Sequence, residues 1–329
     1  YSAGVSHDYK QLVDIDADGL PDMVSSHTED SITVRYNRSG KTNLLKSITN
    51  FTGSKIVLDY QLPPASYDQP SRSWVMSSVE TLDSLNPNGG GRTVTRYYYE
   101  KPHYDRYERT SYGFGTVRSE FVDPQDNSVY RQIQQDYYNG TIQKMGKIKR
   151  ELTFVSPEEL YVEKTYISSY IDEVGNLVQD RDCARGVYPY QDSIMTKYYE
   201  GGTIPLLITG ECMTYDKYHN IVRYVDLGDM SDPADGLSVE ISYLGNQRYN
   251  LVSLKDSTKV FDLGDGQRLR TMAYRYDSHG RQIAYEQISD TTSVLYEFEY
   301  DTVYGNLLLA TRPPNDSGER LAFRYRYDS

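Results

Sequence analysis

The sequence predicts an all-β fold built of antiparallel hairpins. Aromatic and β-branched residues alternate with polar ones in many short stretches, such as those at 274–278 and 298–302, which is the pattern of a half-buried strand. Asp and a Gly-containing turn follow these stretches, so that each pair of strands closes as a hairpin. Tyrosine is unusually frequent, with 34 residues against 7 Phe and 1 Trp. Its apolar ring and polar hydroxyl suit wide sheets whose faces are partly wet.

Composition limits the function as well as the fold. The mean hydropathy of -0.68 and the hydrophobic content of 38% predict burial in a thin layer rather than in a large core. With a net charge of -12 and a pI near 5.0, the chain lacks the basic face that a nucleic-acid binder needs. No apolar run reaches the ~18 residues of a membrane span. We therefore expect neither a nucleic-acid partner nor a membrane span.

The chain begins at Tyr1 without a Met and ends inside a repeated phrase, which indicates a piece of a longer protein. Its first residues do not have the pattern of a signal peptide. Two cysteines, Cys183 and Cys212, are too few for a disulfide framework. A single bridge in an exported protein and two free thiols both remain open.

The first segment, residues 1–38, holds an acidic loop between two strand-like runs. The loop has the pattern DxDxDGxxD from Asp14 to Asp22. Carboxylates on alternate residues of a tight loop can converge on one hard cation, and Gly19 permits the sharp turn. The alternative is an acidic turn without an ion. The sequence predicts a structural Ca²⁺ site whose ligands are Asp14, Asp16, Asp18, Asp22 and the carbonyl of Leu20.

The acidic loop is not that of an EF-hand, because Ser25 stands at the twelfth position, where an EF-hand has Glu. We therefore expect strands rather than helices on either side. The spacing resembles the calcium loops of FG-GAP and VCBS-type β-propeller blades. That resemblance implies that residues 1–38 are the end of a propeller-like blade.

The second segment, residues 39–125, contains short strands around the turn at 50–53, a strand ended by Pro63 and Pro64, and an apolar run near Trp74. The order LLKSITN, Gly turn, YDxP and SxWVMSSVE resembles the middle region of the B component of insecticidal Tc toxins. The element YDR at 104–106, followed by GFG at 113–115, fits the same pattern. The resemblance implies that a β-shell begins here.

Between Thr93 and Asp123, tyrosines are interleaved with arginines. Such a surface could stack nucleic-acid bases. In an acidic chain, however, this pattern favours ladders of Tyr and Arg across neighbouring strands.

The third segment, residues 126–329, carries the repeat. Tyr-Asp pairs begin at Tyr276, Tyr300 and Tyr327, so the steps are 24 and 27 residues. A regular period of this length indicates stacked structural units. A fourth pair, Tyr215-Asp216, has His219 where the turn would otherwise carry Gly. The residues assigned to the repeat are Tyr215, Asp216, Tyr276, Asp277, Gly280, Tyr300, Asp301, Gly305, Asn306, Tyr327 and Asp328.

These repeats resemble the YD (Rhs) repeats of bacterial polymorphic toxins and teneurins. The resemblance implies an arc of a hollow β-shell that encapsulates a C-terminal toxin polypeptide for delivery. The partners that it implies are the rest of the shell, a toxin C component or cargo, and a pore-forming A component. It further implies a bacterial protein that is secreted or on the cell surface.

No pattern in the sequence selects an active site. The five His lie in separate polar turns, and no HExxH or GxSxG is present. Glu297 and Glu299 form ExE, a spacing that resembles the catalytic glutamates of ADP-ribosyltransferases, but they alternate with aromatic residues as on an outward-facing strand. We expect a structural, non-catalytic protein. Two alternatives remain: an extracellular adhesion or carbohydrate-binding β module, and an enzyme with a pocket that holds two carboxylates or a carboxylate and a His.

Overall fold

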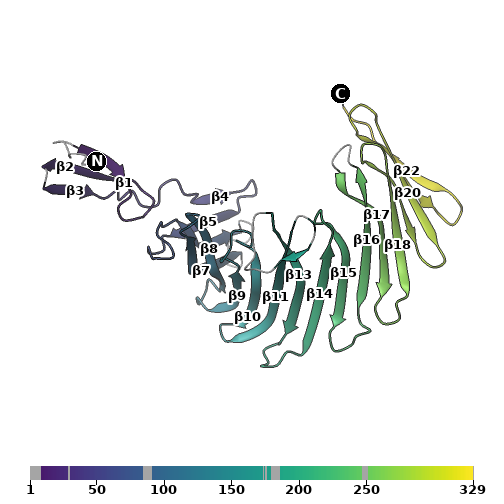
Figure 1. The fold of residues 1–329 in the computed structure, drawn as a ribbon, viewed down its shortest axis with the longest axis horizontal. Coiled ribbons are helices and arrows are strands. Elements are labelled where there is room, and N and C mark those ends of the chain that lie inside the picture. Colours follow the sequence, from purple (N-terminus) through teal and green to yellow (C-terminus); the bar gives the residue numbers. More distant parts are fainter. Residues whose placement is uncertain are drawn as a thin grey trace. The chain divides into compact units, whose positions relative to one another are not determined.

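The computed structural model describes residues 9–28, 30–83, 91–172, 174, 176–178, 186–246 and 251–328. All regular elements in these ranges are strands, which follow one another in chain order (Figure 1). The strands are β1 (Tyr9–Val13), β2 (Asp22–Thr28), β3 (Ser31–Arg35), β4 (Ser47–Thr49), β5 (Lys55–Gln61), β6 (Val75–Leu82), β7 (Arg92–Asp105), β8 (Thr110–Val122), β9 (Val129–Tyr137), β10 (Ile148–Ser156), β11 (Glu159–Ile171), β12 (Leu177–Val178), β13 (Tyr188–Tyr198), β14 (Leu207–Tyr215), β15 (Ile221–Asp229), β16 (Leu237–Asn246), β17 (Leu251–Asp262), β18 (Arg268–Tyr276), β19 (Gln282–Ile288), β20 (Ser293–Tyr300), β21 (Leu307–Pro314) and β22 (Arg320–Arg324).

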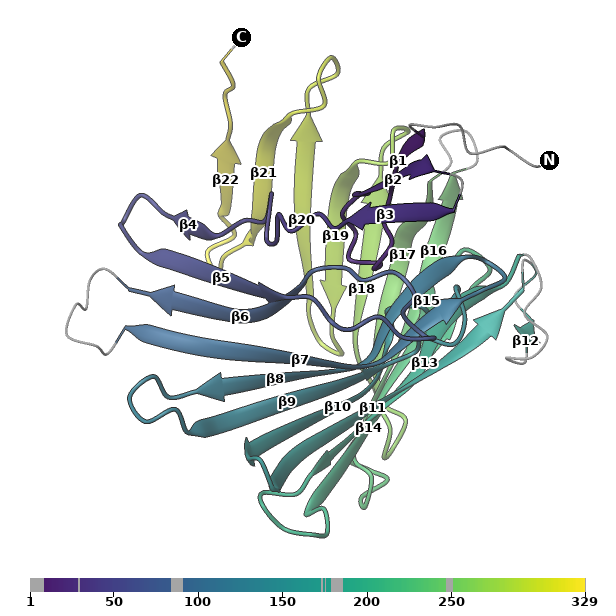
Figure 2. The ribbon, with the colours of Figure 1, turned by 90° about the vertical axis from the view of Figure 1, so that its left-hand side faces the viewer.

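The chain forms two compact units. The first comprises Tyr1–Glu163 with Tyr199–Ile204. Its strands β1, β2 and β3 form a separate antiparallel sheet, in which Met23 lies opposite both Leu12 and Arg35. Strands β4 to β10 form a second sheet, in which each strand pairs antiparallel with the next, and Figure 2 shows β5 to β10 side by side.

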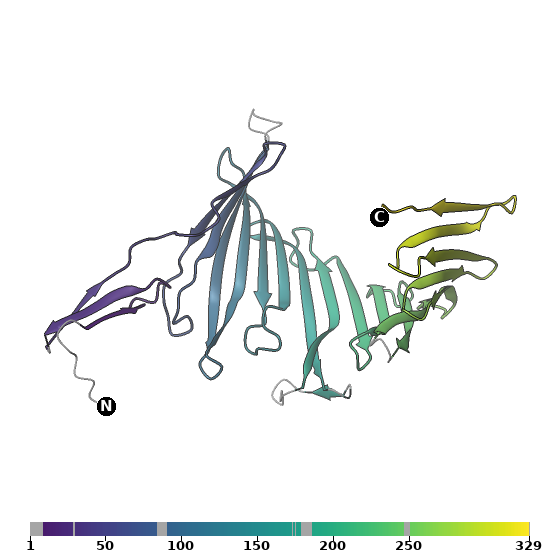
Figure 3. The ribbon, with the colours of Figure 1, turned by 90° about the horizontal axis from the view of Figure 1, so that it is seen from above.

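The second unit comprises Lys164–Tyr198 with Pro205–Ser329. From β13 to β22 each strand pairs antiparallel with its successor. The last strands of this unit, yellow-green and yellow in Figure 3, lie one beside the other. The prediction of an all-β chain of antiparallel hairpins is therefore confirmed.

Burial is spread thinly over these sheets. Among the described residues, few apolar side chains are almost fully buried: Tyr112, Val122, Tyr170, Ile171, Val260 and Ala284. Most other strand residues are half-buried, on both faces of the strands. Without a thick core, the backbone ladders and the side-chain pairs across neighbouring strands must hold much of the structure together.

Tyrosine hydroxyls fasten several strands to their neighbours. Tyr300 at the end of β20 donates to the carbonyl of Gln282, the first residue of β19, at 3.0 Å. In the same way Tyr243 on β16 donates at 2.9 Å to the carbonyl of Ile221, the first residue of β15. Tyr327 contacts Leu307 at 3.0 Å, Tyr60 contacts Leu45 at 2.9 Å and Tyr99 contacts Met76 at 2.8 Å. Phe could not make this bond, which is one reason for the excess of Tyr.

One Tyr and Arg pair after Thr93 lies across neighbouring strands. Tyr98 on β7 is directly opposite Arg118 on β8, and the guanidinium carbon lies 4.6 Å from the ring centroid. Burial and the nearby Glu120 carboxylate raise the pKa of Tyr98. This pair is the cross-strand ladder that the sequence favours over a base-stacking surface.

Candidate functional site

The acidic loop joins β1 to β2 and is closed by its own carboxylates. Asp14 accepts hydrogen bonds from the amides of Asp18 at 3.0 Å and Gly19 at 2.9 Å. Asp18 accepts one from the amide of Leu20 at 2.8 Å. These bonds bring one carboxylate oxygen each of Asp14, Asp16 and Asp18 within 4.8 Å of one another. Three converging carboxylates are a donor set that suits a hard cation such as Ca²⁺.

Asp22 differs from the other carboxylates of the acidic loop. Only 1% of its surface is exposed. One oxygen accepts the amide of Asn37 at 2.7 Å and the other accepts the amide of Ile15 at 2.9 Å. The hydrogen bond from Asn37 is the main cause of the lowered pKa of Asp22. Asp22 therefore ties the acidic loop to the end of the three-stranded sheet, and it lies outside the group of three converging carboxylates.

Arg72 fastens the acidic loop to the segment before β6. Its backbone amide and its Nε both donate to the carbonyl of Ala17, at 2.9 and 3.2 Å. Its Nη2 lies 3.8 Å from Oδ2 of Asp16. Ala17 has a φ of 59°, a left-handed conformation that costs a non-glycine residue energy. The two bonds from Arg72 help to hold it there.

The predicted repeat residues form one kind of turn. In the turn after β18, the amide of Asp277 donates to the carbonyl of Arg281 at 2.9 Å. One carboxylate oxygen of Asp277 accepts the amides of His279 and Arg281, both at 2.9 Å, while the other accepts Nε of Arg281 at 2.6 Å. Gly280 has a φ of 81° and closes the turn. Burial of Asp277 tends to raise its pKa, but these hydrogen bonds prevail and lower it.

The other turns vary this arrangement. Asp216 accepts the amides of Tyr218 at 2.8 Å and Asn220 at 2.9 Å. Asp301 accepts the amide of Asn306, in a turn that is one residue longer and has Gly305 at a φ of 76°. The tyrosines that precede these residues, Tyr215, Tyr276 and Tyr300, end strands β14, β18 and β20, while Tyr327 and Asp328 follow β22. The repeat thus specifies a turn that is closed by the side chain of the turn's first residue, which is the Asp of the Tyr-Asp pair.

Two turns outside the predicted repeat are of the same kind: the turn expected at 50–53, and a turn at 315–318 that sequence reasoning missed. The side-chain oxygen of Asn50 accepts the amides of Thr52 at 3.1 Å and Ser54 at 2.9 Å. Asn315 accepts the amides of Ser317 at 3.0 Å and Glu319 at 2.9 Å. Asn carries the same acceptor as Asp, and a Gly with positive φ lies three residues later in both turns. A search for Asp or Asn followed by x-x-Gly finds both turns.

His219 takes the place of Gly in its turn and has a φ of 64°. We expect the His219→Gly variant to be more stable than His219→Ala by about 1 kcal/mol, because only Gly adopts this conformation without steric cost. Both variants lose the contact of the imidazole with the ring of Tyr188, at 5.1 Å between centroids, so this loss cancels in the comparison. Thermal unfolding of the two variants measures the difference.

The neighbouring Tyr218, which does not have a positive φ, provides the control for this prediction. There the order should reverse, with Tyr218→Ala more stable than Tyr218→Gly. Equal stability of the two His219 variants would contradict the strain inferred from the turn.

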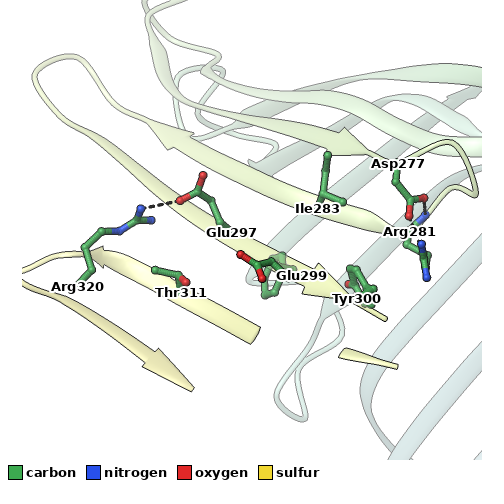
Figure 4. A pocket seen from close by; sticks show the side chains of 9 residues that line it. Asp277, Arg281, Ile283, Glu297, Glu299, Tyr300, Thr311 and Arg320 are labelled. Atoms are coloured by element: carbon green, nitrogen blue, oxygen red, sulfur yellow. Dashed lines mark hydrogen bonds and ion pairs between the residues drawn. The ribbon is translucent and has the colours of Figure 1, made fainter. Parts of the chain in front are cut away.

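A charged cavity of about 750 Å³ lies on strands β19 to β22 (Figure 4). Arg320 at the start of β22 donates to Glu297 on β20 at 2.6 Å, and Arg281 pairs with Asp277 at the same distance. Glu297 and Glu299, the ExE residues, both line this cavity. The residues around it are Asp277, Arg281, Ile283, Glu297, Phe298, Glu299, Tyr300, Thr311 and Arg320.

The remaining sequence expectations concern cysteine and membranes. Cys212 on β14 is exposed, while Cys183 lies outside the described residues. Within the described part of the chain, no helix has the length and apolar character needed to cross a membrane.

Comparison with known proteins finds a sequence similarity in the N-terminal region. Residues 2–144 match the sequence model of the family described as the insecticide toxin TcdB middle/N-terminal region. No curated protein matches the chain in sequence.

Solved structures extend the similarity to the rest of the fold. A TcdB2-TccC3-Cdc42 crystal structure matches with a TM-score of 0.64 and 12% identity over 93% of this chain. A TcdB2-TccC3 structure without its hypervariable C-terminal region gives 0.63 and 12% over 94%. The Tc holotoxin pore of Photorhabdus luminescens gives 0.62 and 12% over 98%. The chain spans 23%, 23% and 24% of the length of these three chains, about a quarter of each. The chain is thus similar in sequence to the TcdB family model over residues 2–144, and it shares its fold with these toxin structures over nearly its whole length.

Proposed function

We propose that this chain is a structural, non-catalytic part of the wall of a toxin-complex shell of the Tc B or Rhs kind. The observation that carries the proposal is the match of residues 2–144 to the TcdB family, together with a fold shared with TcdB2-TccC3 over 94% of the chain. The wall encapsulates a C-terminal toxin polypeptide for delivery.

The thin sheets suit such a wall. Each strand between β5 and β9 is paired on both edges, so its backbone groups are satisfied without a second layer of structure. The half-buried faces carry polar and aromatic residues that tolerate water. A wall of this kind can separate two aqueous spaces with little protein mass.

The partners that we propose follow from the complexes to which the chain is similar. They are the remainder of the shell, a toxin C component such as the TccC3 of the matched structures, and an A component of a holotoxin. The protein is then a secreted or surface-exposed bacterial protein.

The test is co-expression of the chain with a toxin C component that carries its C-terminal polypeptide. Size-exclusion chromatography and limited trypsin digestion then report assembly and protection. We expect a complex in which the C-terminal polypeptide is cut more slowly than in the C component alone. A chain that stays separate, with no change in the cleavage rate, would refute the proposal.

A carbohydrate-binding module calls for a groove lined by exposed tyrosines. The cavity on β19 to β22 has two aromatic residues, Phe298 and Tyr300, among nine lining residues, of which five are charged. This composition offers a glycan little aromatic surface on which to stack. The structural role is therefore preferred over carbohydrate binding.

We further propose that the acidic loop binds Ca²⁺ as a structural ion. Asp14, Asp16 and Asp18 provide converging carboxylates, and their mutual repulsion is relieved by a cation. Asp22 and the Leu20 carbonyl are the other proposed ligands. Each oxygen of Asp22 already accepts one backbone amide and keeps a second lone pair.

Calcium is expected to raise the melting temperature of the wild type, because an ion that binds only the folded state stabilises it, by about 2.7 kcal/mol at a hundredfold excess over Kd. Asp16→Ala combined with Asp18→Ala should abolish the rise. Asp232→Ala combined with Asp235→Ala, in the separate acidic loop between β15 and β16, serves as the control and should keep it. Calorimetric melting with and without calcium decides, and a wild type that does not respond would contradict the site.

A further inference from the structure

The charged cavity holds a carboxylate that is left without a counter-charge. Glu297 and Glu299 are two residues apart on β20 and therefore project to the same side of the sheet. Thr311 on β21 is the cross-strand partner of Glu297, so its hydroxyl lies on that side as well. Figure 4 shows Glu299 beside Thr311, with Glu297 turned toward Arg320. Among the residues that the structure describes, Glu299 has neither an ion pair nor a side-chain hydrogen bond, and it is exposed.

The two arginines of the cavity are held by partners other than Glu299. Arg320 donates to Glu297 at 2.6 Å and to the carbonyls of Arg312 at 3.0 Å and Leu295 at 3.3 Å. Arg281 donates to Asp277 at 2.6 Å and to the carbonyl of Asp301 at 2.9 Å, and its guanidinium carbon lies 5.3 Å from the ring centroid of Tyr300. A guanidinium that is held by several acceptors is fixed in place.

The charges of the cavity therefore favour a cation. Three carboxylates (Asp277, Glu297 and Glu299) and two guanidinium groups line it, which leaves one negative charge, located at Glu299. An incoming anion would meet Glu299 and find both arginines engaged. An ammonium or guanidinium group can instead pair with Glu299 and donate a second hydrogen bond to the hydroxyl oxygen of Thr311.

We propose that this cavity binds a lysine or arginine side chain of an extended polypeptide, with Glu299 as its charge partner. The inference rests on the proposed function, in which the wall faces an enclosed polypeptide. A volume of about 750 Å³ exceeds what a lone inorganic cation needs and accommodates a long side chain with its flanking backbone.

The test measures binding of a fluorescein-labelled short lysine peptide to the whole chain by fluorescence anisotropy at low ionic strength. Glu299→Gln removes the charge and keeps the shape of the side chain. Glu158→Gln, in the exposed turn between β10 and β11, makes the same chemical change away from the cavity. Because both side chains are exposed, both variants should melt as the wild type does.

We expect Glu299→Gln to weaken binding of the peptide about fivefold, which is the upper range for one exposed ion pair. Glu158→Gln should leave the affinity unchanged. Raising the ionic strength from about 0.05 M to about 0.5 M should remove most of the difference. Equal weakening in both variants would show attraction to the acidic surface in general and overturn the site, as would a wild type that does not bind. The assay uses this chain alone, so a failed co-expression assay and a failed peptide assay are separate results.

Discussion

Replacing Tyr170 by Ala is expected to lower the free energy of unfolding of the second unit by about 4 kcal/mol, the usual cost of removing a large ring from a core. Tyr170 lies near the end of β11, opposite Val178 of β12, and is 1% exposed. It is among the largest fully buried side chains in the described residues. Because burial elsewhere is thin, the neighbours have little other apolar surface with which to fill the space.

The matched control for Tyr170 is Tyr304→Ala in the same unit. Tyr304 lies in the turn after β20 and is 85% exposed, so its ring should contribute less than about 0.5 kcal/mol. Tyr170→Phe separates the hydroxyl from the ring. Hydrogen exchange of the amides of β11 and β14 reports the opening of this unit, and similar exchange in Tyr170→Ala and Tyr304→Ala would contradict the core assigned to Tyr170.

Asp136→Ala is expected to cost about 2 kcal/mol in the first unit, because it leaves charged and polar donors without an acceptor. Asp136 on β9 is the cross-strand partner of Thr116 on β8 and of Arg150 on β10. Its carboxylate accepts Oγ1 of Thr116 at 2.9 Å, and Nε and Nη2 of Arg150 at 3.0 and 2.8 Å. One side chain thereby joins three strands.

The contribution of Asp136 should also depend on pH. Burial tends to raise its pKa, but the hydrogen bonds from Arg150 and Thr116 prevail, so that its pKa in the folded chain is below the ordinary value of 3.8. The contribution is therefore complete above about pH 5, one unit above the usual pKa of an unfolded Asp, and is lost as the pH falls through the folded value. The difference between wild type and Asp136→Ala should shrink as the pH falls from about 5 through this lowered pKa.

Denaturant unfolding at several pH values provides this measurement. A double-mutant cycle with Arg150→Ala isolates the energy of the ion pair between Asp136 and Arg150, because effects that each residue has on its own cancel in the cycle. A difference between wild type and Asp136→Ala that is the same at every pH would mean that Asp136 acts through packing and not through its charge.

The local structure of this protein could be predicted from its sequence. Alternation of aromatic and polar residues predicts the strands, and Asp followed by Gly predicts the turns. Both patterns work because these elements depend on neighbouring residues alone. The acidic loop from Asp14 to Asp18 was found for the same reason, since its three carboxylates come from a segment of five residues. The motifs between Leu44 and Gly115, which resemble the Tc toxin B component, lie within the residues 2–144 that match the TcdB family model.

The tertiary structure decided how side chains from distant strands meet. Asp22 fits the loop pattern in sequence, yet its carboxylate is held by Asn37, and Arg72 reaches the same loop from the segment before β6. Glu297 and Glu299 are equivalent in the sequence pattern, but only Glu297 meets Arg320. These contacts depend on strand register and on the path of the chain between strands, because a charged side chain pairs only with a side chain that lies close to it in space. No local sequence pattern encodes which distant residue that is.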